Sequence, residues 1–184
     1  MLTKKDRQRF ERLSLPHLDA AYNLALWMLR NPAEAEDTVQ IAFMRAFEAF
    51  NSFSGNNIAA WLMTIVRNTA INTLNRNKRN SNLVSFDEIA HNTEKPHINN
   101  HDLRPDEVMS LITKQTVIAE LIERLPLDHR EVLYLRDIEG YSYKEISEII
   151  LLPKGTVMSR LSRARAQLQK WLLQQQRKEH FRGL

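Results

Sequence analysis

The chain has 184 residues, of which 43% are hydrophobic, with four glycines, six prolines and no cysteine. This length allows one large domain or two small ones, and long runs of helix-forming residues with little glycine predict an all-α protein. The lack of cysteine excludes disulfides and thiolate metal sites. No stretch approaches the about eighteen apolar residues of a membrane span and the N-terminus has no apolar signal core, so we expect a cytoplasmic protein without membrane insertion.

The net charge of +4 is unevenly distributed along the chain. Residues 1–77 carry nine basic and seven acidic side chains, residues 78–107 carry four and six, and residues 108–184 carry thirteen and nine. Basic ends around a slightly acidic middle suit two nucleic-acid contacts joined by a tether. The charge pattern therefore favours two domains, 1–77 and 108–184, with a linker between them.

A helix is predicted to begin after Asn31 in the N-terminal part. Asn31 is a favourable N-cap, Pro32 suits the first helical position, and Glu34 stands at the capping-box position. The carboxylates that follow would stabilise the positive end of the helix dipole, which is sufficient reason for Glu34 without any partner. Aromatic residues spaced four and three apart predict a buried stripe on the same helix: Phe43, Phe47 and Phe50.

Asn68 and Asn72 lie four residues apart and therefore share one face of a second predicted helix. Asparagine is a mediocre helix former, so two of them on one face need a reason. They are either two exposed amides without a partner or part of a functional surface. Residues 51–60, just before this helix, are expected to form a loop of polar and small residues.

Residues 78–107 are rich in asparagine, acidic residues, histidine and proline, and they show no sustained apolar periodicity. This composition predicts a flexible linker of about thirty residues. His91, His97 and His101 lie in it without the spacing of a metal site, so we expect solvated imidazoles and no zinc. The two domains share no obvious hydrophobic interface pattern, and we expect them to lack one fixed arrangement in solution.

Two helices are predicted in the first part of the C-terminal domain. Residues 125–138 form one, with Asp128 as its cap and Glu131 at the capping-box position. Its expected buried side chains are Val132, Leu133, Leu135 and Ile138. Residues 143–150 form a shorter helix with Ser142 as N-cap. Its expected inward side chains are Ile146, Ile149 and Ile150.

After Pro153 and Gly155 interrupt the chain, a long basic helix is predicted. Its apolar residues recur every three or four positions: Val157, Leu161, Ala164, Leu168 and Leu172. The opposite face carries short or polar side chains with arginines beside them: Ser159, Ser162, Ala166, Lys170, Arg160, Arg163 and Arg165. From Lys154 to Arg182 there are eight basic residues and one acidic residue.

A short polar crest allows a helix to enter a DNA major groove, where arginine reads guanine edges or holds phosphates. A short helix, a tight turn and a basic amphipathic helix together indicate a helix-turn-helix. The alternative for the last helix alone is a solvated basic surface without a partner.

Motifs in both halves of the chain follow a known family pattern. In the C-terminal half they are Leu125-Pro, Arg130-Glu-Val-Leu, Glu139-Gly-Tyr-Ser-Tyr-Lys-Glu-Ile and the run from Gly155 to Arg165. These segments resemble region 4 of the extracytoplasmic-function (group 4) sigma factors of bacterial RNA polymerase. Residues 31–47 resemble the acidic motif and Val-Gln-x-x-Phe helix of region 2, and residues 60–74 resemble its Trp-Leu-x-x-Ile-x-x-Asn helix. The ordered pair of regions carries the resemblance, because a lone helix-turn-helix is weak evidence.

The resemblance implies an all-α, two-domain initiation factor with no enzymatic activity, no metal and no cofactor. Such a factor binds core RNA polymerase, engages duplex −35 DNA through region 4, and melts and traps the −10 strand of promoter DNA through region 2. Members of this class are typically held inactive by an anti-sigma factor, which is therefore an expected partner.

The resemblance also implies three sets of site residues. The core-polymerase set is Glu36, Asp37, Gln40 and Ile41. The −10 set is Ser54, Asn56, Asn57, Trp61, Arg67, Asn68, Asn72 and Arg76. The −35 set is Lys154, Thr156, Met158, Ser159, Arg160, Ser162, Arg163 and Arg165. Within these sets Trp61 suits a structural role, and Thr156, Arg160 and Arg165 suit phosphate or intramolecular contacts.

Three departures from the family pattern affect these expectations. Ile41 stands where the family usually has glutamate, which weakens one polar contact to polymerase. The loop 51–60 is one residue shorter than in common relatives and lacks their aromatic residue near Ile58 and Ala59, which bears on the identity of the recognised base. Met158 replaces a base-reading arginine, so a somewhat different −35 sequence is expected.

Two other functions compete with this interpretation. A dimeric regulator with a helix-turn-helix would bind an operator, but it has no use for the Asp37/Gln40 helix. A small nucleic-acid-processing enzyme would need a metal-ligand spacing, a nucleophile constellation or a phosphate-binding glycine loop, and the sequence offers none of these.

Overall fold

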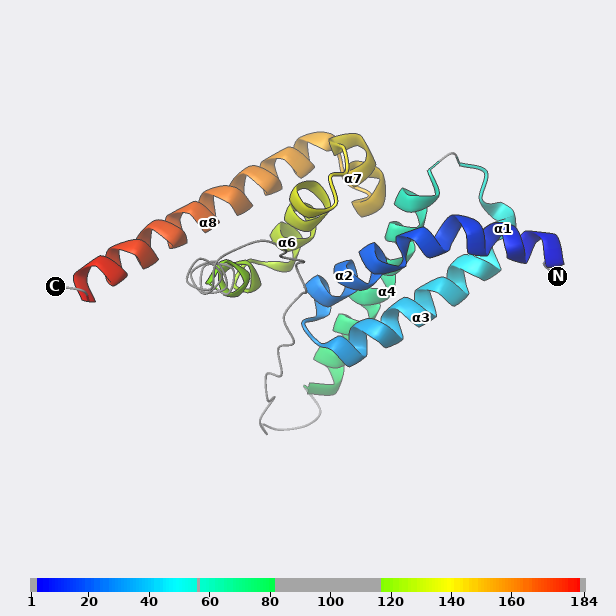
Figure 1. Cartoon of the computed structure of the whole chain (residues 1–184), viewed down its shortest axis with the longest axis horizontal. Helices are drawn as coiled ribbons and strands as arrows, with labels where there is room; N and C mark the ends of the chain where they lie inside the picture. Colours follow the sequence, from blue (N-terminus) through cyan, green and yellow to red (C-terminus); the bar gives the residue numbers. More distant parts are fainter. Residues whose placement is uncertain (1–2, 56, 82–116, 183–184) are drawn as a thin grey trace, which may run out of the picture.

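The computed structural model describes residues 3–55, 57–81 and 117–182, and all regular elements within these ranges are helical (Figure 1). The all-α prediction is therefore confirmed. The N-terminal elements are α1 (Lys4–Ser14), η1 (Leu15–His17), α2 (Leu18–Leu29), α3 (Pro32–Ala49), η2 (Phe50–Ser52) and α4 (Ile58–Ser81). The C-terminal elements are helical residues 117–123, α6 (Leu127–Leu133), the π-helical turn η3 (Tyr134–Ile138), α7 (Tyr143–Ile150) and α8 (Lys154–Arg182).

Side-chain caps fix where α3 and α7 begin. The Asn31 side chain accepts a hydrogen bond from the Glu34 amide at 3.2 Å, with Pro32 as the first helical residue. At α7, Ser142 and Glu145 form a reciprocal capping box with distances of 3.2 and 2.8 Å. Each cap satisfies amide groups that the first turn of a helix leaves without partners. Both predicted N-caps are confirmed, but Glu34 does not complete a capping box, because its carboxylate accepts a hydrogen bond from the Asn77 side chain at 2.7 Å.

The predicted start and buried face of the helix at 125–138 are partly wrong. The helix α6 begins at Leu127 without a side-chain cap, and Asp128 lies in its first turn. Glu131 does not reach back to the start of the helix but is buried, with 2% of its surface exposed. Ile138 is 58% exposed because the chain widens into the π-helical turn, where the Glu139 amide donates to the Tyr134 carbonyl five residues earlier and shifts the register.

The N-terminal part is a bundle in which α2, α3 and α4 pack on one another (Figure 1). At one end of this bundle the ring of Phe10, from α1, meets three phenylalanine rings edge-on, with centroid distances of 5.3 to 6.5 Å. The partners are Phe43, Phe47 and Phe50, so the predicted aromatic stripe is confirmed. None of the described helices has the length and apolar content needed to cross a membrane.

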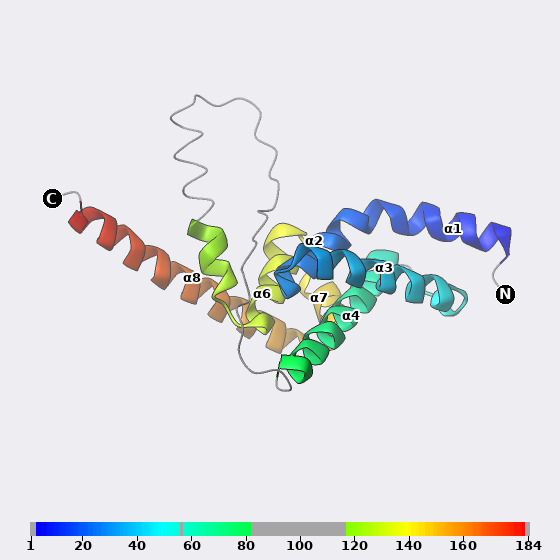
Figure 2. The same ribbon diagram turned by 90° about the horizontal axis from the view of Figure 1, so that it is seen from below.

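The two parts of the chain pack against each other, contrary to the expectation that they share no hydrophobic interface. Helix α4 contacts α7, and α2 contacts α6, as the two views show together (Figure 2). Tyr134 is fully buried, and its ring lies 5.5 Å from that of Trp27. Its hydroxyl donates to the Glu139 carboxylate at 2.5 Å and lies 3.3 Å from the Ala20 carbonyl oxygen of the other half. Local sequence patterns do not predict this interface, because its aromatic contact joins residues more than a hundred positions apart.

The predicted linker lies mostly outside the described residues. Residues 78–81 form the last turn of α4, so the helix continues past the domain end that the sequence suggested at residue 77. Residues 82–107, with the three histidines considered for zinc, are not among those described.

Candidate nucleic-acid and polymerase interfaces

The first half of α8 has one buried and one exposed face, as its sequence pattern predicts. Val157, Leu161 and Ala164 are buried, whereas Ser159, Ser162 and Arg163 are exposed. The Ser159 hydroxyl donates to the Thr156 carbonyl at 3.0 Å, which keeps this side chain close to the helix surface. The crest is thus low and polar with a guanidinium beside it, a shape that fits a major groove.

The other predicted −35 residues surround this crest. Lys154 lies at the start of α8 and is exposed, and Thr156 is half-buried. Met158 is 53% exposed, so its apolar side chain is presented where an arginine would otherwise reach bases. A thioether offers no donor pair to guanine, which supports the expectation of a different −35 sequence.

Arg160 and Arg165 make intramolecular ion pairs. Arg160 lies 3.4 Å from the Asp128 carboxylate and 3.5 Å from that of Glu131. Arg165 forms a two-point contact with Asp137 across η3 and α8, one arm of which measures 3.1 Å. Hydrogen bonding to Asp137 raises the pKa of Arg165 above its ordinary value. These two arginines hold α8 on α6 and η3.

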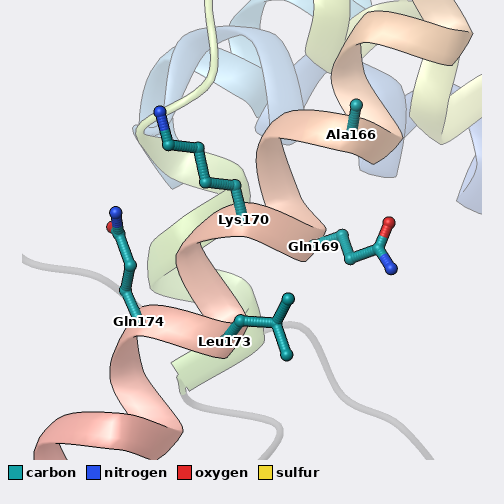
Figure 3. Close-up of a pocket in the computed structure, with 5 residues that line it drawn as sticks. All are labelled: Ala166, Gln169, Lys170, Leu173 and Gln174. Atoms are coloured by element: carbon teal, nitrogen blue, oxygen red, sulfur yellow. The ribbon is translucent and has the colours of Figure 1, made fainter.

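Beyond this segment, α8 continues as a regular helix with a shallow depression along its outer face (Figure 3). All five side chains that line it come from successive turns of α8 itself: Ala166, Gln169, Lys170, Leu173 and Gln174. Lys170 is exposed as predicted, and Leu173 is 51% exposed.

In the N-terminal part, α4 presents a polar strip. Asn68, Asn72 and Arg76 are exposed at spacings of four, so they line one face of the helix. At the start of α4 the Asn57 side-chain oxygen accepts a hydrogen bond from the Ala60 amide at 3.0 Å. Asn57 is therefore also a capping residue, a role that the sequence analysis did not assign.

The loop before α4 borders a cavity of about 600 Å³. Trp61 forms part of its wall and lies 5.0 Å from the ring of Phe53, which agrees with a structural role for this tryptophan. Ser54 also lines the cavity, whereas Asn56 is not among the described residues. Two further lining residues, Glu148 and Leu151, come from α7 and the turn after it.

Arg67, which the family resemblance places in the −10 set, pairs with Glu131 of the other half. Its Nε and Nη2 atoms donate to the two carboxylate oxygens at 2.7 and 3.1 Å. The two side chains are 14% and 2% exposed. A two-point charged contact that is largely screened from water is among the stronger polar interactions in proteins. In this arrangement Arg67 serves the interface between the two halves.

On α3, the four residues of the predicted polymerase-binding set are all exposed. Glu36, Asp37 and Gln40 form a polar strip, and Ile41 is 38% exposed beside it. Met44, one turn further along, is 65% exposed and was not in the predicted set. Exposed apolar side chains next to carboxylate and amide groups are typical of a protein-binding surface. The position of Met44, three after Ile41, was the sequence signal that could have revealed it.

The comparisons with known proteins now bear on this geometry. The sigma-70 region 2 family matches residues 13–80, and the sigma-70 region 4 family matches residues 115–168. The RNA polymerase sigma-H factor of Pseudomonas aeruginosa is 32% identical over 91% of this chain and 88% of its own length. The ECF RNA polymerase sigma-E factor of Escherichia coli K12 is 37% identical over 72% and 70%.

The chain belongs to the ECF sigma factors. Among solved structures, the sigma factor RpoE of Bartonella quintana, in complex with the anti-sigma factor NepR, superimposes with a TM-score of 0.70. It is 29% identical, and the match covers 90% of this chain and 97% of that one. The family resemblance read from the sequence is thus confirmed. As a sigma factor, the protein is a transcription initiation factor and not an enzyme.

Within the sigma factor, region 2 comprises the helices up to α4, and region 4 comprises helical residues 117–123 and the following helices into α8. Three features that the sequence did not reveal lie where these two regions meet. They are the Arg67–Glu131 pair, a hydrogen bond of 2.8 Å from the Asn57 amide to Glu145, and Leu151 beside the loop cavity.

Proposed function

We propose that this ECF sigma factor binds core RNA polymerase with the exposed face of α3, reads the −35 element with α8, and captures the −10 strand with α4 and its preceding loop. The division of labour follows the domains 1–77 and 108–184, with 78–107 as a tether. The factor acts in the cytoplasm, where promoter DNA and polymerase meet.

The exposed crest of α8 is the observation that carries this proposal. The apolar stripe of α8 is buried against the rest of region 4. The arginines of its first half fall into two groups. Arg160 and Arg165 are paired within the domain, whereas Arg163 is exposed on the crest with Ser159 and Ser162. An exposed guanidinium beside two small hydroxyl side chains can form a bidentate contact with one guanine.

The loop cavity supports a −10 role for region 2. It is bounded by an aromatic wall, by the hydroxyl groups of Ser52 and Ser54 and by the Asn57 amide. The strip of Asn68, Asn72 and Arg76 continues along α4. Aromatic side chains stack on unpaired bases, and polar groups read their exposed edges.

An anti-sigma factor is a further proposed partner. The similar Bartonella sigma factor was solved in complex with an anti-sigma factor, and its chain superimposes on 90% of this one. The apolar and acidic face of α3 and the outer face of α8 are surfaces that such a partner would have to cover.

Transcription in vitro tests the proposal directly. Core polymerase with the purified factor should produce transcripts from a promoter library randomised at −35 and −10, and sequencing of the transcribed templates should show two conserved elements. The Arg163→Ala variant is the control, since it should relax selection at −35 alone. Enrichment of an operator-like palindrome, or transcripts without selected elements, would contradict the proposal.

A further inference from the structure

A groove in region 4 gathers positive charge that the rest of the domain does not neutralise. It lies between the segment that leads into α6 and the middle of α8, and its volume is about 670 Å³. We call it the basic groove, after the polar and aromatic side chains in its lining: Arg124, His129, Arg163, Gln167, Lys170 and Trp171. No aspartate or glutamate is among the described residues that line it.

The three cationic side chains of the basic groove are exposed and have no acidic partner in the described part of the chain. Arg124, Arg163 and Lys170 take part in none of the ion pairs formed there. The neighbouring Arg160 and Arg165 differ, because they pair with carboxylates of α6 and η3. A concave site lined by charge of one sign concentrates the electrostatic potential and attracts ions of the opposite sign. The basic groove therefore favours an anion.

His129 adds an unsatisfied polar group to the wall of the basic groove. Its side chain is half-buried, and the Nδ1 atom is buried with no hydrogen-bond partner among the described residues. Buried polar atoms in folded proteins nearly always have a partner, and each exception needs an explanation. An Nδ1–H group can donate to an oxygen of a ligand bound beside it.

Trp171 gives the basic groove an aromatic surface. The indole is half-buried, and the Arg124 guanidinium lies over its face, 4.8 Å from the ring centre. Aromatic rings and guanidinium planes bind nucleobases by stacking, because every base has a π-face. The basic groove thus combines a surface for a base with cations for phosphate groups.

A free nucleotide suits the basic groove better than the backbone of duplex DNA does. The volume of the groove falls within the roughly 300–1,000 Å³ of small-molecule sites. The bases of a duplex are paired and stacked on one another, so none is available to stack beside Trp171. The phosphates of one nucleoside triphosphate can neutralise all three cations of the groove.

Arg163 joins the basic groove to the proposed −35 surface. It lines the groove and also stands on the exposed crest with Ser159 and Ser162. Lys170 lies seven residues further along α8, which is about 10 Å at the rise of an α-helix, so one nucleotide can reach both cations. The same N–H groups of Arg163 cannot hold a phosphate and a guanine edge at once.

We propose that the basic groove of region 4 binds a free nucleoside triphosphate, and that the bound nucleotide withdraws Arg163 from −35 DNA. The phosphates interact with Arg163, Lys170 and His129, and the base stacks beside Trp171. Nucleotide and −35 element compete for one side chain, so nucleotide binding lowers the affinity for −35 DNA. The nucleotide site rests on the groove alone, whereas the competition rests on the proposed −35 role of Arg163.

Isothermal titration calorimetry of the full chain tests the nucleotide site, with GTP as the probe. Ribose 5′-triphosphate carries the same phosphates without a base and should bind more weakly than GTP. Lys170→Ala and Arg124→Ala should each weaken GTP binding about tenfold, because each removes a charged hydrogen-bond donor. The proposal is overturned if GTP does not bind, or if ribose 5′-triphosphate binds as tightly as GTP.

Lys144→Ala is the matched control for both variants. Lys144 is also an exposed cation of region 4, but it lies on α7 beside Glu148 and does not line the basic groove. Its removal should leave the affinity for GTP unchanged. An equal loss with Lys144→Ala would attribute GTP binding to net charge and overturn the site.

Displacement of a fluorescent −35 duplex by GTP tests the competition. The ionic strength is held constant, because salt alone weakens binding to DNA. GTP should displace the duplex from the wild type, and about tenfold more GTP should be needed with Lys170→Ala, in line with its weaker binding. Binding of GTP without displacement would overturn the competition.

The two experiments also separate this inference from the function on which its second half rests. If GTP does not bind and Lys170→Ala weakens every −35 duplex equally, the groove holds a phosphate of the DNA backbone and the nucleotide site is wrong. If no form of the protein binds a −35 duplex, the proposed −35 role is wrong, and calorimetry with GTP still decides whether the groove takes a nucleotide.

Discussion

The two surfaces proposed for promoter DNA differ in what covers them. On α8, the crest of Ser159, Ser162 and Arg163 is exposed, and the arginines beside it are neutralised from within region 4. On α4 and its loop, Arg67 and Asn57 are held by carboxylates from the other half of the chain. The pattern of one helix thus predicts its exposed face only where no distant part of the chain supplies complementary groups.

The largest expected effect concerns a third surface, the exposed face of α3. The double variant Asp37→Ala with Gln40→Ala should abolish holoenzyme formation, because it removes two polar side chains from the proposed polymerase-binding face. Both side chains are exposed, so the fold itself should be unaffected. A cost of about 2 kcal/mol or more for each residue is typical of central contacts in protein interfaces. Titration with labelled core polymerase measures the loss, and the melting temperature should stay nearly constant. Unchanged affinity would return both residues to surface roles.

Breaking the Arg67–Glu131 ion pair, which joins the two halves of the chain, should have the next largest effect. Glu131→Ala leaves the Arg67 guanidinium, which is 14% exposed, without its partner. Removal of one member of a buried pair costs about 3–5 kcal/mol, which urea unfolding would detect. Asp137→Ala, which breaks the more exposed pair with Arg165, should cost less than about 1 kcal/mol. Similar losses from both substitutions would show that the contact between the halves adds no stability.

On the uncovered −35 surface, Arg163→Ala should reduce discrimination by about 1–3 kcal/mol, concentrated at one or two base pairs. Binding of core polymerase should be unaffected, because α3 supplies that contact. Competition between −35 duplex variants measures the change. Equal weakening on every variant would instead identify Arg163 as a phosphate contact.

Glycine substitutions at the two left-handed helix ends should give smaller, stabilising effects. Arg30→Gly and Leu151→Gly each remove a side chain from a position with φ near 60°, which should raise the unfolding free energy by about 0.5–1 kcal/mol. The gain in unfolding free energy should be larger for Arg30→Gly, because this change also removes a charge that repels Arg130. Burial and the nearby Arg30 lower the pKa of Arg130 to about 10. Gly140→Ala, at φ of 75°, should have the opposite sign.

The smallest effect is expected from acid. Hydrogen bonds from the backbone and hydroxyl of Ser142 lower the pKa of Glu145 below its ordinary value, and Asn57 contributes further. The stabilisation is therefore complete above the ordinary glutamate pKa and is lost as the pH falls through the lowered one. In the Glu145→Gln variant, the unfolding free energy should depend less on pH in the acid range. Near neutrality, the unfolding free energies of wild type and variant should depend on pH in the same way. An unchanged acid dependence would exclude the carboxylate as its source.

Short-range features of the sequence were predictable, and long-range ones were not. The caps at Asn31 and Ser142 and the stripe of α8 follow from residues within a few positions of one another, and the structure has them as predicted. Glu131 departs from the capping prediction because it lies three positions from Asp128 but sixty-four positions from Arg67, its partner in the structure. A capping motif in the sequence gives no sign that a distant arginine competes for the same carboxylate.

The same limit applies to the site residues. Exposure on α3 and α8 could be predicted from helical spacing, whereas the occupation of Asn57 and Arg67 depends on how two domains meet. Ile138 shows a local version of this problem. The π-helical turn breaks the spacing that placed Ile138 inside, and the sequence contains no proline or glycine within residues 134–138 to announce it.

The chain's three tryptophans occupy three different surroundings, which makes the protein its own optical reporter. Trp27 lies against Tyr134 where the regions meet, Trp61 lies against Phe53 at the loop cavity, and Trp171 lies 4.8 Å beneath the Arg124 guanidinium in region 4. Single-tryptophan versions would therefore emit separate signals for domain opening, strand entry and region 4 unfolding. Stopped-flow fluorescence could then order these events in time, without any attached dye.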